Sequence, residues 1–154
     1  MIFTGRKAEV AVLQEALNSP ESEMISIIGR RRVGKTFLVR TVYGKHLDFE
    51  ISGIQHASGT EQLRNFYQRL KEFFPATTVT EPPQDWLSAF FMLTEHLEQK
   101  QKNQKLVIFL DEVPWMATHK SGFLKGLSFF WNSWADDGSK TYTAKEIMLC
   151  PGSI

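Results

Sequence analysis

The sequence predicts an α/β fold in which helices cover both faces of a parallel sheet. Short apolar runs rich in β-branched residues, at positions 24–28 and 106–110, have the length and composition of buried strands. Longer segments between and after these runs carry apolar residues at helical spacing. Strands that alternate with helices favour parallel pairing, because each connection must cross one face of the sheet before the next strand begins.

The elements follow from these periods in chain order. In the second expected helix, Phe37, Leu38 and Val42 are expected to face the core. Ser58 and Glu61 have the spacing of a capping box and mark the start of the third helix. A proline-rich loop is expected at residues 75–83. The expected helices cover residues 7–17, 36–43, 60–74, 86–97 and 123–134, and further strands are expected at 47–51 and 147–150.

The composition is ordinary for one soluble domain of 154 residues. Eighteen Lys and Arg nearly balance seventeen Asp and Glu, so the overall charge gives nucleic-acid binding no support. The single cysteine, Cys150, excludes an internal disulfide framework. No apolar run is long enough for a signal peptide or a membrane span. A cytoplasmic protein without membrane contact is therefore expected.

A glycine-bounded loop follows the first expected strand and matches G-x-x-x-x-G-K-[ST], the phosphate-binding P-loop pattern. The two glycines permit backbone angles that let successive N–H groups converge on a phosphate. Lys35 is expected to reach the β- and γ-phosphates, and the Thr36 hydroxyl to bind Mg²⁺. The loop consists of Gly29, Arg30, Arg31, Arg32, Val33, Gly34, Lys35 and Thr36.

The three arginines of this loop allow two interpretations. They are a solvated basic edge, or one of them adds positive charge to bound phosphates or to an acidic partner. The sequence does not decide between the two.

Two acids follow the strand expected at 106–110. Asp111 and Glu112 should lie at the carboxyl edge of the sheet, where ligands bind in parallel α/β folds. Asp111 is predicted to hold Mg²⁺ together with Thr36, and Glu112 to orient and deprotonate the water that attacks the γ-phosphate. The alternative is a strand that simply ends in solvated acids. The adjacent Asp-Glu pair favours hydrolysis over phosphate transfer, and no Asn-Lys-x-Asp sequence indicates GTP, so ATP is the expected nucleotide.

The two motifs are separated by 75 residues (111 − 36), which leaves room for one extra strand and two helices. This spacing indicates the class of P-loop ATPases that insert a strand between the motifs. The predicted fold is therefore a three-layer P-loop NTPase fold with a parallel sheet, incomplete at the C-terminal end. The strand at 147–150 is expected to be its unpartnered edge.

Trp115 and the four histidines allow other roles than core packing. Trp115 is interpreted as a core residue or, alternatively, as part of the nucleotide pocket or a partner surface. Four histidines lie singly without metal-ligand spacing and are expected at the surface or its edge rather than on zinc; they are His46, His56, His96 and His119.

With these motifs, the chain resembles the archaeal-type ATPases of the AAA-like superfamily, which are related to the signalling STAND ATPases. The spelling of the phosphate loop is the most specific part of the resemblance. The opening box is similar to the family's F-x-G-R-x-x-E. The similar segments are residues 3–6 with Glu9, 29–36, 110–115, 120–123 and 130–132.

The resemblance implies that Gly5 and Arg6 lie near the adenine and close over the nucleotide. It implies an ATPase core at residues 1–135, and an atypical tail at 136–154 that begins the strand which carries a polar sensor residue in the family. Family members continue into a further strand and a helical lid, so turnover is expected to depend on such parts. The open alternatives are a nucleotide-binding module without turnover and a P-loop kinase. A protein partner or self-association is also expected.

Overall fold

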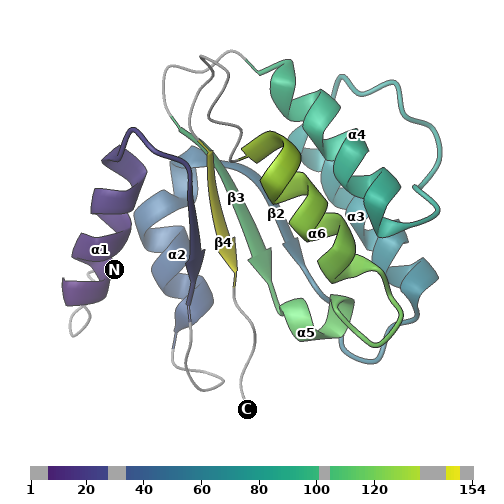
Figure 1. Cartoon of the computed structure of the whole chain (residues 1–154), viewed down its shortest axis with the longest axis horizontal. Helices are drawn as coiled ribbons and strands as arrows, with labels where there is room; N and C mark the ends of the chain where they lie inside the picture. Colours follow the sequence, from purple (N-terminus) through teal and green to yellow (C-terminus); the bar gives the residue numbers. More distant parts are fainter. Residues whose placement is uncertain (1–6, 28–33, 101–104, 136–144, 150–154) are drawn as a thin grey trace.

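A computed structural model of the chain describes residues 7–27, 34–100, 105–135 and 145–149 (Figure 1). Within these residues, the strands form one four-stranded sheet in the order β1-β4-β3-β2, and every neighbouring pair is parallel. The predicted parallel sheet is thus confirmed. The strands are β1 (Glu23–Ser26), β2 (Leu47–Ser52), β3 (Leu106–Asp111) and β4 (Lys145–Leu149).

The expected helices are all present, with ends that differ from the expectation by a few residues. A short helix that was not expected, α5, follows the acidic residues directly. Residues 75–83 contain no helix or strand, as expected for a loop. The helices are α1 (Lys7–Asn18), α2 (Lys35–Tyr43), α3 (Gly59–Phe73), α4 (Trp86–Glu98), α5 (Val113–Met116) and α6 (Phe123–Phe130), with a 3-10 turn at Gly44–His46 and a π-helical turn at Trp131–Ala135.

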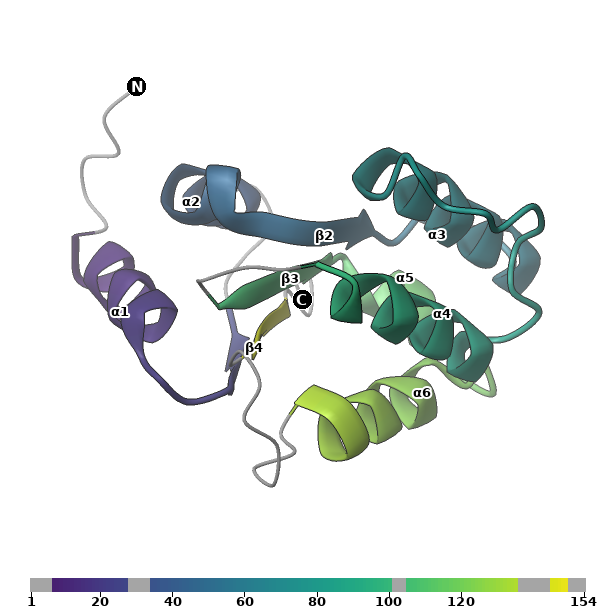
Figure 2. The same ribbon diagram turned by 90° about the horizontal axis from the view of Figure 1, so that it is seen from above.

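Helices cover both faces of the sheet, as Figure 2 shows. On one face, α1 and α2 pack against Val107 and Phe109 of β3. On the other face, α3, α4, α5 and α6 pack against Ile108 and Leu110 of the same strand. Every residue of β3 is buried, which explains its continuous apolar sequence.

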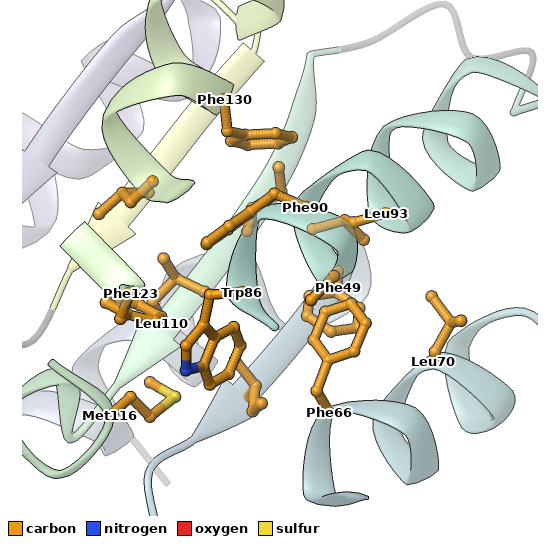
Figure 3. Packing of buried hydrophobic residues seen from close by; sticks show 14 of the residues in the cluster. Phe49, Phe66, Leu70, Trp86, Phe90, Leu93, Leu110, Met116, Phe123 and Phe130 are labelled. Carbon is orange, nitrogen blue, oxygen red and sulfur yellow. The ribbon is translucent and has the colours of Figure 1, made fainter. Parts of the chain in front are cut away.

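The larger core lies between α4, α6 and the sheet and is rich in aromatic rings (Figure 3). Trp86 and Phe123 meet edge to face with ring centroids 4.9 Å apart, and Phe90 lies 5.1 Å from Phe130. Gly126 permits this close approach of the two helices, since a Cβ there would lie 2.9 Å from the Phe90 ring. The aromatic stripes read from the sequence therefore belong to one packed layer.

Strand β4 lies between β1 and β3 and pairs with both. The expectation that this strand would be an unpartnered edge of the sheet is therefore wrong. A strand in the middle of a parallel sheet pairs its backbone groups on both sides, which stabilises it more than the edge position would. The edges of the described sheet are β1 and β2.

The inward face of α2 also differs from the expectation. Leu38 and Val39 are buried, but Phe37 is 40% exposed. The buried side chains recur at positions 35, 38, 39 and 43, which is helical spacing, and Phe37 lies about 100° around the helix from Leu38. Phe37 lies outside this buried stripe, so the expectation that it faces the core is wrong.

Asp48 sets the register between β2 and β3. The pairing register shifts between Leu47 and Phe49, with Asp48 as the extra residue of β2. Its buried side chain links β2 to β3 and to the segment that follows α4, because Oδ2 accepts a hydrogen bond from the Val107 N–H at 2.8 Å and Oδ1 accepts one from Lys100 Nζ at 2.9 Å. This bulge brings Ser52 opposite Asp111 at the carboxyl ends of the strands.

Candidate functional site

The carboxyl ends of the strands are level at one edge of the sheet. Ser26 of β1 pairs with Leu149 of β4, and Leu149 pairs with Leu110 of β3. Asp111 is therefore one residue beyond the level at which β1 ends. Figure 1 shows α5 at this same edge. In open parallel sheets this edge is where ligands bind.

The last three residues of the phosphate-loop motif form the start of α2. Gly34 is its N-cap, with φ 80° and ψ 25°, a left-handed conformation that favours glycine. Its carbonyl accepts the Leu38 N–H at 2.8 Å, so the helix begins without a capping side chain. The first helical residues are thus Lys35 and Thr36, at the positive end of the helix dipole. Only 9% of Lys35 is exposed.

Thr36 and Asp111 come together although 75 residues separate them in sequence. The Thr36 hydroxyl Oγ1 donates a hydrogen bond to Asp111 Oδ2 at 2.6 Å. The other carboxylate oxygen, Oδ1, accepts the Glu112 N–H at 2.9 Å. Asp111 is only 6% exposed, so its carboxylate is fixed by these contacts rather than solvated. The alternative of a strand ending in freely solvated acids does not hold for Asp111.

Glu112 adopts a left-handed backbone conformation, with φ 53° and ψ 42°, at the N-cap of α5. Non-glycine residues in this region are uncommon and are found disproportionately at functional sites. The conformation turns the chain sharply from β3 into α5. The Glu112 carboxylate accepts a hydrogen bond from the Trp115 indole, Nε1 to Oε2, at 3.2 Å. The sequence allowed Trp115 either a core position or a position at the site. In the structure it is half-buried, and its indole contacts Glu112 directly.

Two residues at this edge were missed by the sequence analysis. The Gly53 N–H donates to the Asp111 carbonyl at 3.0 Å, and a Cβ on Gly53 would lie 2.4 Å from the Glu112 carbonyl oxygen. Gln62 is buried and joins the segment after β2 to α5 through its carboxamide. Neither residue belongs to a motif. The only signal in the sequence is that Gly53 lies two residues after the strand expected at 47–51.

The other predicted site residues fall outside the part of the chain that the structure describes. The proposals for their roles rest on the sequence alone. They are Gly5, Arg6, Gly29, Arg30, Arg31, Arg32 and Val33.

The donor pair at the sheet edge has the chemistry of a magnesium site. A threonine hydroxyl and a carboxylate are hard oxygen donors, and Mg²⁺ is commonly bound by one or two such groups together with substrate phosphates and water. Thr36 and Asp111 fit this pattern because their oxygens lie 2.6 Å apart at the first turn of α2, and helix N-termini commonly bind phosphates in proteins. Among the described residues, no group of three or more His, Cys, Asp or Glu is placed to hold a metal ion.

His56 and His96 contact neighbouring side chains and backbone. His56 is exposed, and its ring lies edge-on to Trp115 with centroids 5.2 Å apart. His96 is partly buried, and its Nδ1 lies 2.7 Å from the Met92 carbonyl while its Nε2 lies 2.6 Å from Thr77 Oγ1. Within the described ranges, no helix is both long and apolar enough to cross a membrane.

Two features together define the P-loop NTPase fold. A phosphate-loop motif ends in the first turn of a helix beside a parallel sheet, and an acidic residue accepts a hydrogen bond from the motif's threonine. The family model described as "AAA domain" matches residues 20–145, and the chain belongs to this family. The matched range includes the phosphate loop, Asp111 and Glu112. No curated protein matched the chain. Family membership supports nucleotide binding and ATPase activity.

Proposed function

We propose that this chain binds ATP with Mg²⁺ and hydrolyses it to ADP and phosphate. The observation that carries the proposal is the 2.6 Å hydrogen bond between Thr36 and Asp111, because it brings the phosphate-loop motif and the acidic strand end to one point. The residues proposed to bind the nucleotide are those of the loop at 29–36, with Gly5 and Arg6 near the adenine. Mg²⁺ would be held by Thr36 and Asp111 and would neutralise charge on the phosphates.

In the proposed reaction, the oxygen of a water molecule forms a bond to the γ-phosphorus. The bond from this phosphorus to the β,γ-bridging oxygen breaks, and the electron pair leaves with ADP. Glu112 accepts the proton from the water, since it is the carboxylate next to Asp111 at the same sheet edge. Lys35 contributes a positive charge to the β- and γ-phosphates.

The nucleotide-binding role is tested with Lys35→Ala. Removing a charge-assisted contact is expected to weaken ATP affinity about tenfold or more. Lys45→Ala, an exposed lysine in the 3-10 turn that follows α2, is the matched control and should leave affinity unchanged. Titration calorimetry with Mg·ATP measures both. Equal affinity in wild type and Lys35→Ala would contradict the proposal.

The division of labour between the two acids is tested with Glu112→Gln and Asp111→Asn. Glu112→Gln is expected to retain ATP affinity and to lower phosphate release about a hundredfold or more, because a general base is lost. Asp111→Asn is expected to raise the Mg²⁺ concentration needed for binding. Glu95→Gln, an exposed acid on α4, is the matched control. Phosphate release from Glu112→Gln at the wild-type rate would show that the assignment is wrong.

The two alternatives predict different results in the same assay. A binding module without turnover binds ATP but releases no phosphate, and a kinase releases phosphate only when an acceptor is added. Steady-state phosphate release without acceptor supports the ATPase. The relationship to archaeal-type and STAND ATPases stays a prediction.

Association with a protein partner or with a second copy is also a prediction. It is supported by an exposed aromatic pair, Phe91 of α4 and Phe129 of α6. Their rings meet edge to face with centroids 5.4 Å apart, and Phe91 is 48% exposed and Phe129 46% exposed. Light scattering over a range of protein concentrations measures self-association.

A further inference from the structure

The side chain of Glu112 is held by one specific contact. Trp115 lies one helical turn further along, and its indole N–H donates to Glu112 Oε2 at 3.2 Å. The backbone reinforces this geometry, because the Trp115 N–H donates to the Glu112 carbonyl at 3.1 Å. Among the described residues, the second carboxylate oxygen, Oε1, makes no hydrogen bond. One oxygen is therefore fixed, and the other can accept a proton.

Trp115 is itself anchored to the connection between β2 and α3. The carboxamide of Gln62 donates from Nε2 to the Trp115 carbonyl at 3.0 Å and to the Ile54 carbonyl at 2.7 Å. Its oxygen accepts the Ile54 N–H at 3.0 Å. Gln62 is 2% exposed, and such a buried amide is costly to leave unpaired. It therefore joins the two segments rigidly, and the ring of His56 packs against the indole from the same connection.

The same indole-to-carboxylate contact occurs once more in the described chain, away from the sheet edge. The Trp134 Nε1 donates to Glu98 Oε1 at 3.0 Å, between the turn after α6 and the end of α4. This second pair provides a chemically matched control. The exchange of Trp for Phe removes the same donor in both places.

We propose that Trp115 is a positioning residue for ATP hydrolysis, which fixes Glu112 Oε2 so that Oε1 accepts the proton of the attacking water. This inference rests on the proposed function. Trp115 touches neither nucleotide nor water in this scheme, and it acts only through Glu112. Gln62 transmits the position of the β2–α3 connection to Trp115, so this connection sets the orientation of the general base.

The kinetic test compares Trp115→Phe with Trp134→Phe. Trp115→Phe keeps an aromatic ring but loses the donor, and it is expected to lower kcat about tenfold while the Kd for ATP changes less than about twofold. Trp134→Phe should change neither value. Trp115→His retains a ring nitrogen at the ε position and should recover part of kcat. In the Glu112→Gln background, Trp115→Phe should have no further effect, because the two residues act as one unit.

A second measurement detects the contact without hydrolysis. In the ¹⁵N-labelled protein, the indole N–H signals of Trp115 and Trp134 are assigned by their loss in the two Phe variants. Glu112→Gln should shift the Trp115 signal and leave that of Trp134 in place. An unshifted Trp115 signal would overturn the inference, as would wild-type kcat in a folded Trp115→Phe variant or an equal loss in the Glu112→Gln background. A different outcome is that Glu112→Gln shifts the Trp115 signal but the wild-type chain binds ATP without releasing phosphate. This outcome would overturn the proposed function, and the catalytic role of Trp115 with it.

Discussion

At the scale of single residues, the sheet edge depends on a glycine that carries no functional group. Gly53 allows the end of β2 to approach the Glu112 carbonyl, and an added Cβ would lie 2.4 Å from that oxygen. The obstacle is backbone, which cannot rotate away as a flexible side chain does. Relief therefore requires a shift of Glu112 or of the segment after β2.

Gly53→Ala is accordingly expected to impair the proposed site more than the fold. Displacing Glu112, the proposed general base, should lower phosphate release more than about tenfold, since misplacement by about 1 Å can cost a hundredfold. The overpacking should reduce the free energy of unfolding by about 1–3 kcal/mol. Gly59→Ala is the control, because a Cβ on Gly59 meets nothing within 4 Å. Thermal melts and phosphate release measure both variants, and equal behaviour of the two would contradict the expectation.

The sequence could predict Thr36, Lys35 and Asp111 because their chemistry requires fixed residue types at fixed spacing. The 2.6 Å contact of Thr36 with Asp111 agrees with the role proposed for the pair. Gln62 could not be predicted in the same way. Its role depends on hydrogen bonds to backbone atoms of two other segments, and any residue type can supply a backbone partner. Residues that act through tertiary contacts leave no local pattern.

At the scale of helices and strands, capping decides where the helices begin. The expected box at Ser58 and Glu61 is confirmed, since each side chain accepts the other's backbone N–H. Asp85 caps α4 in a similar way, with Oδ1 accepting the Ser88 N–H at 2.7 Å. The helix α5 was not predicted because four residues are too few to show a period. Its start depends on the left-handed turn at Glu112 and on Pro114 in its first turn.

The cap at Asp85 makes part of the stability of the protein depend on pH. The backbone hydrogen bond from Ser88 lowers the pKa of Asp85 below its ordinary value. Because the pKa of Asp85 is lower in the folded state, the charged cap stabilises the fold at pH values above the unfolded-state pKa of about 3.9. This stabilisation is lost as the pH falls through the folded-state pKa. Asp85→Ala should therefore reduce the free energy of unfolding by about 1 kcal/mol at pH 7.

The difference between wild type and Asp85→Ala should narrow as the pH is lowered below about 4, where the carboxylate becomes protonated. Asp85→Asn is the control. It retains a neutral capping oxygen, so its free energy of unfolding at pH 7 should fall less than that of Asp85→Ala. Urea unfolding at pH 7 and at pH 3 measures both effects. A difference that stays constant with pH would argue against the charged cap.

At the scale of the whole molecule, the halves of the proposed site are held together by a strand between them. The phosphate loop follows β1 and Asp111 ends β3, yet these strands do not pair with each other. Strand β4 joins them. Local sequence could predict that a strand lies near residues 147–150, but not its neighbours, because strand order is set by how the connections cross the sheet. The last strand in the chain therefore need not be an edge of the sheet, and β4 is not one.

Proline substitutions distinguish a central strand from an edge. In a parallel sheet, successive backbone N–H groups point to opposite neighbours, so adjacent residues of β4 donate to different strands. If β4 is central, Ile147→Pro and Met148→Pro each remove one ladder hydrogen bond and leave a carbonyl unpaired, which costs on the order of 1–3 kcal/mol before any strain. If β4 were an edge strand of the sheet, only one of the two variants would remove a ladder hydrogen bond. Both variants are therefore expected to lose thermal stability and ATP affinity together, because separation of β1 from β3 also separates Thr36 from Asp111.

Ile147→Val and Met148→Leu are the controls, measured by circular dichroism melts and by titration with ATP. A fully stable Ile147→Pro or Met148→Pro variant would show that β4 has a free side.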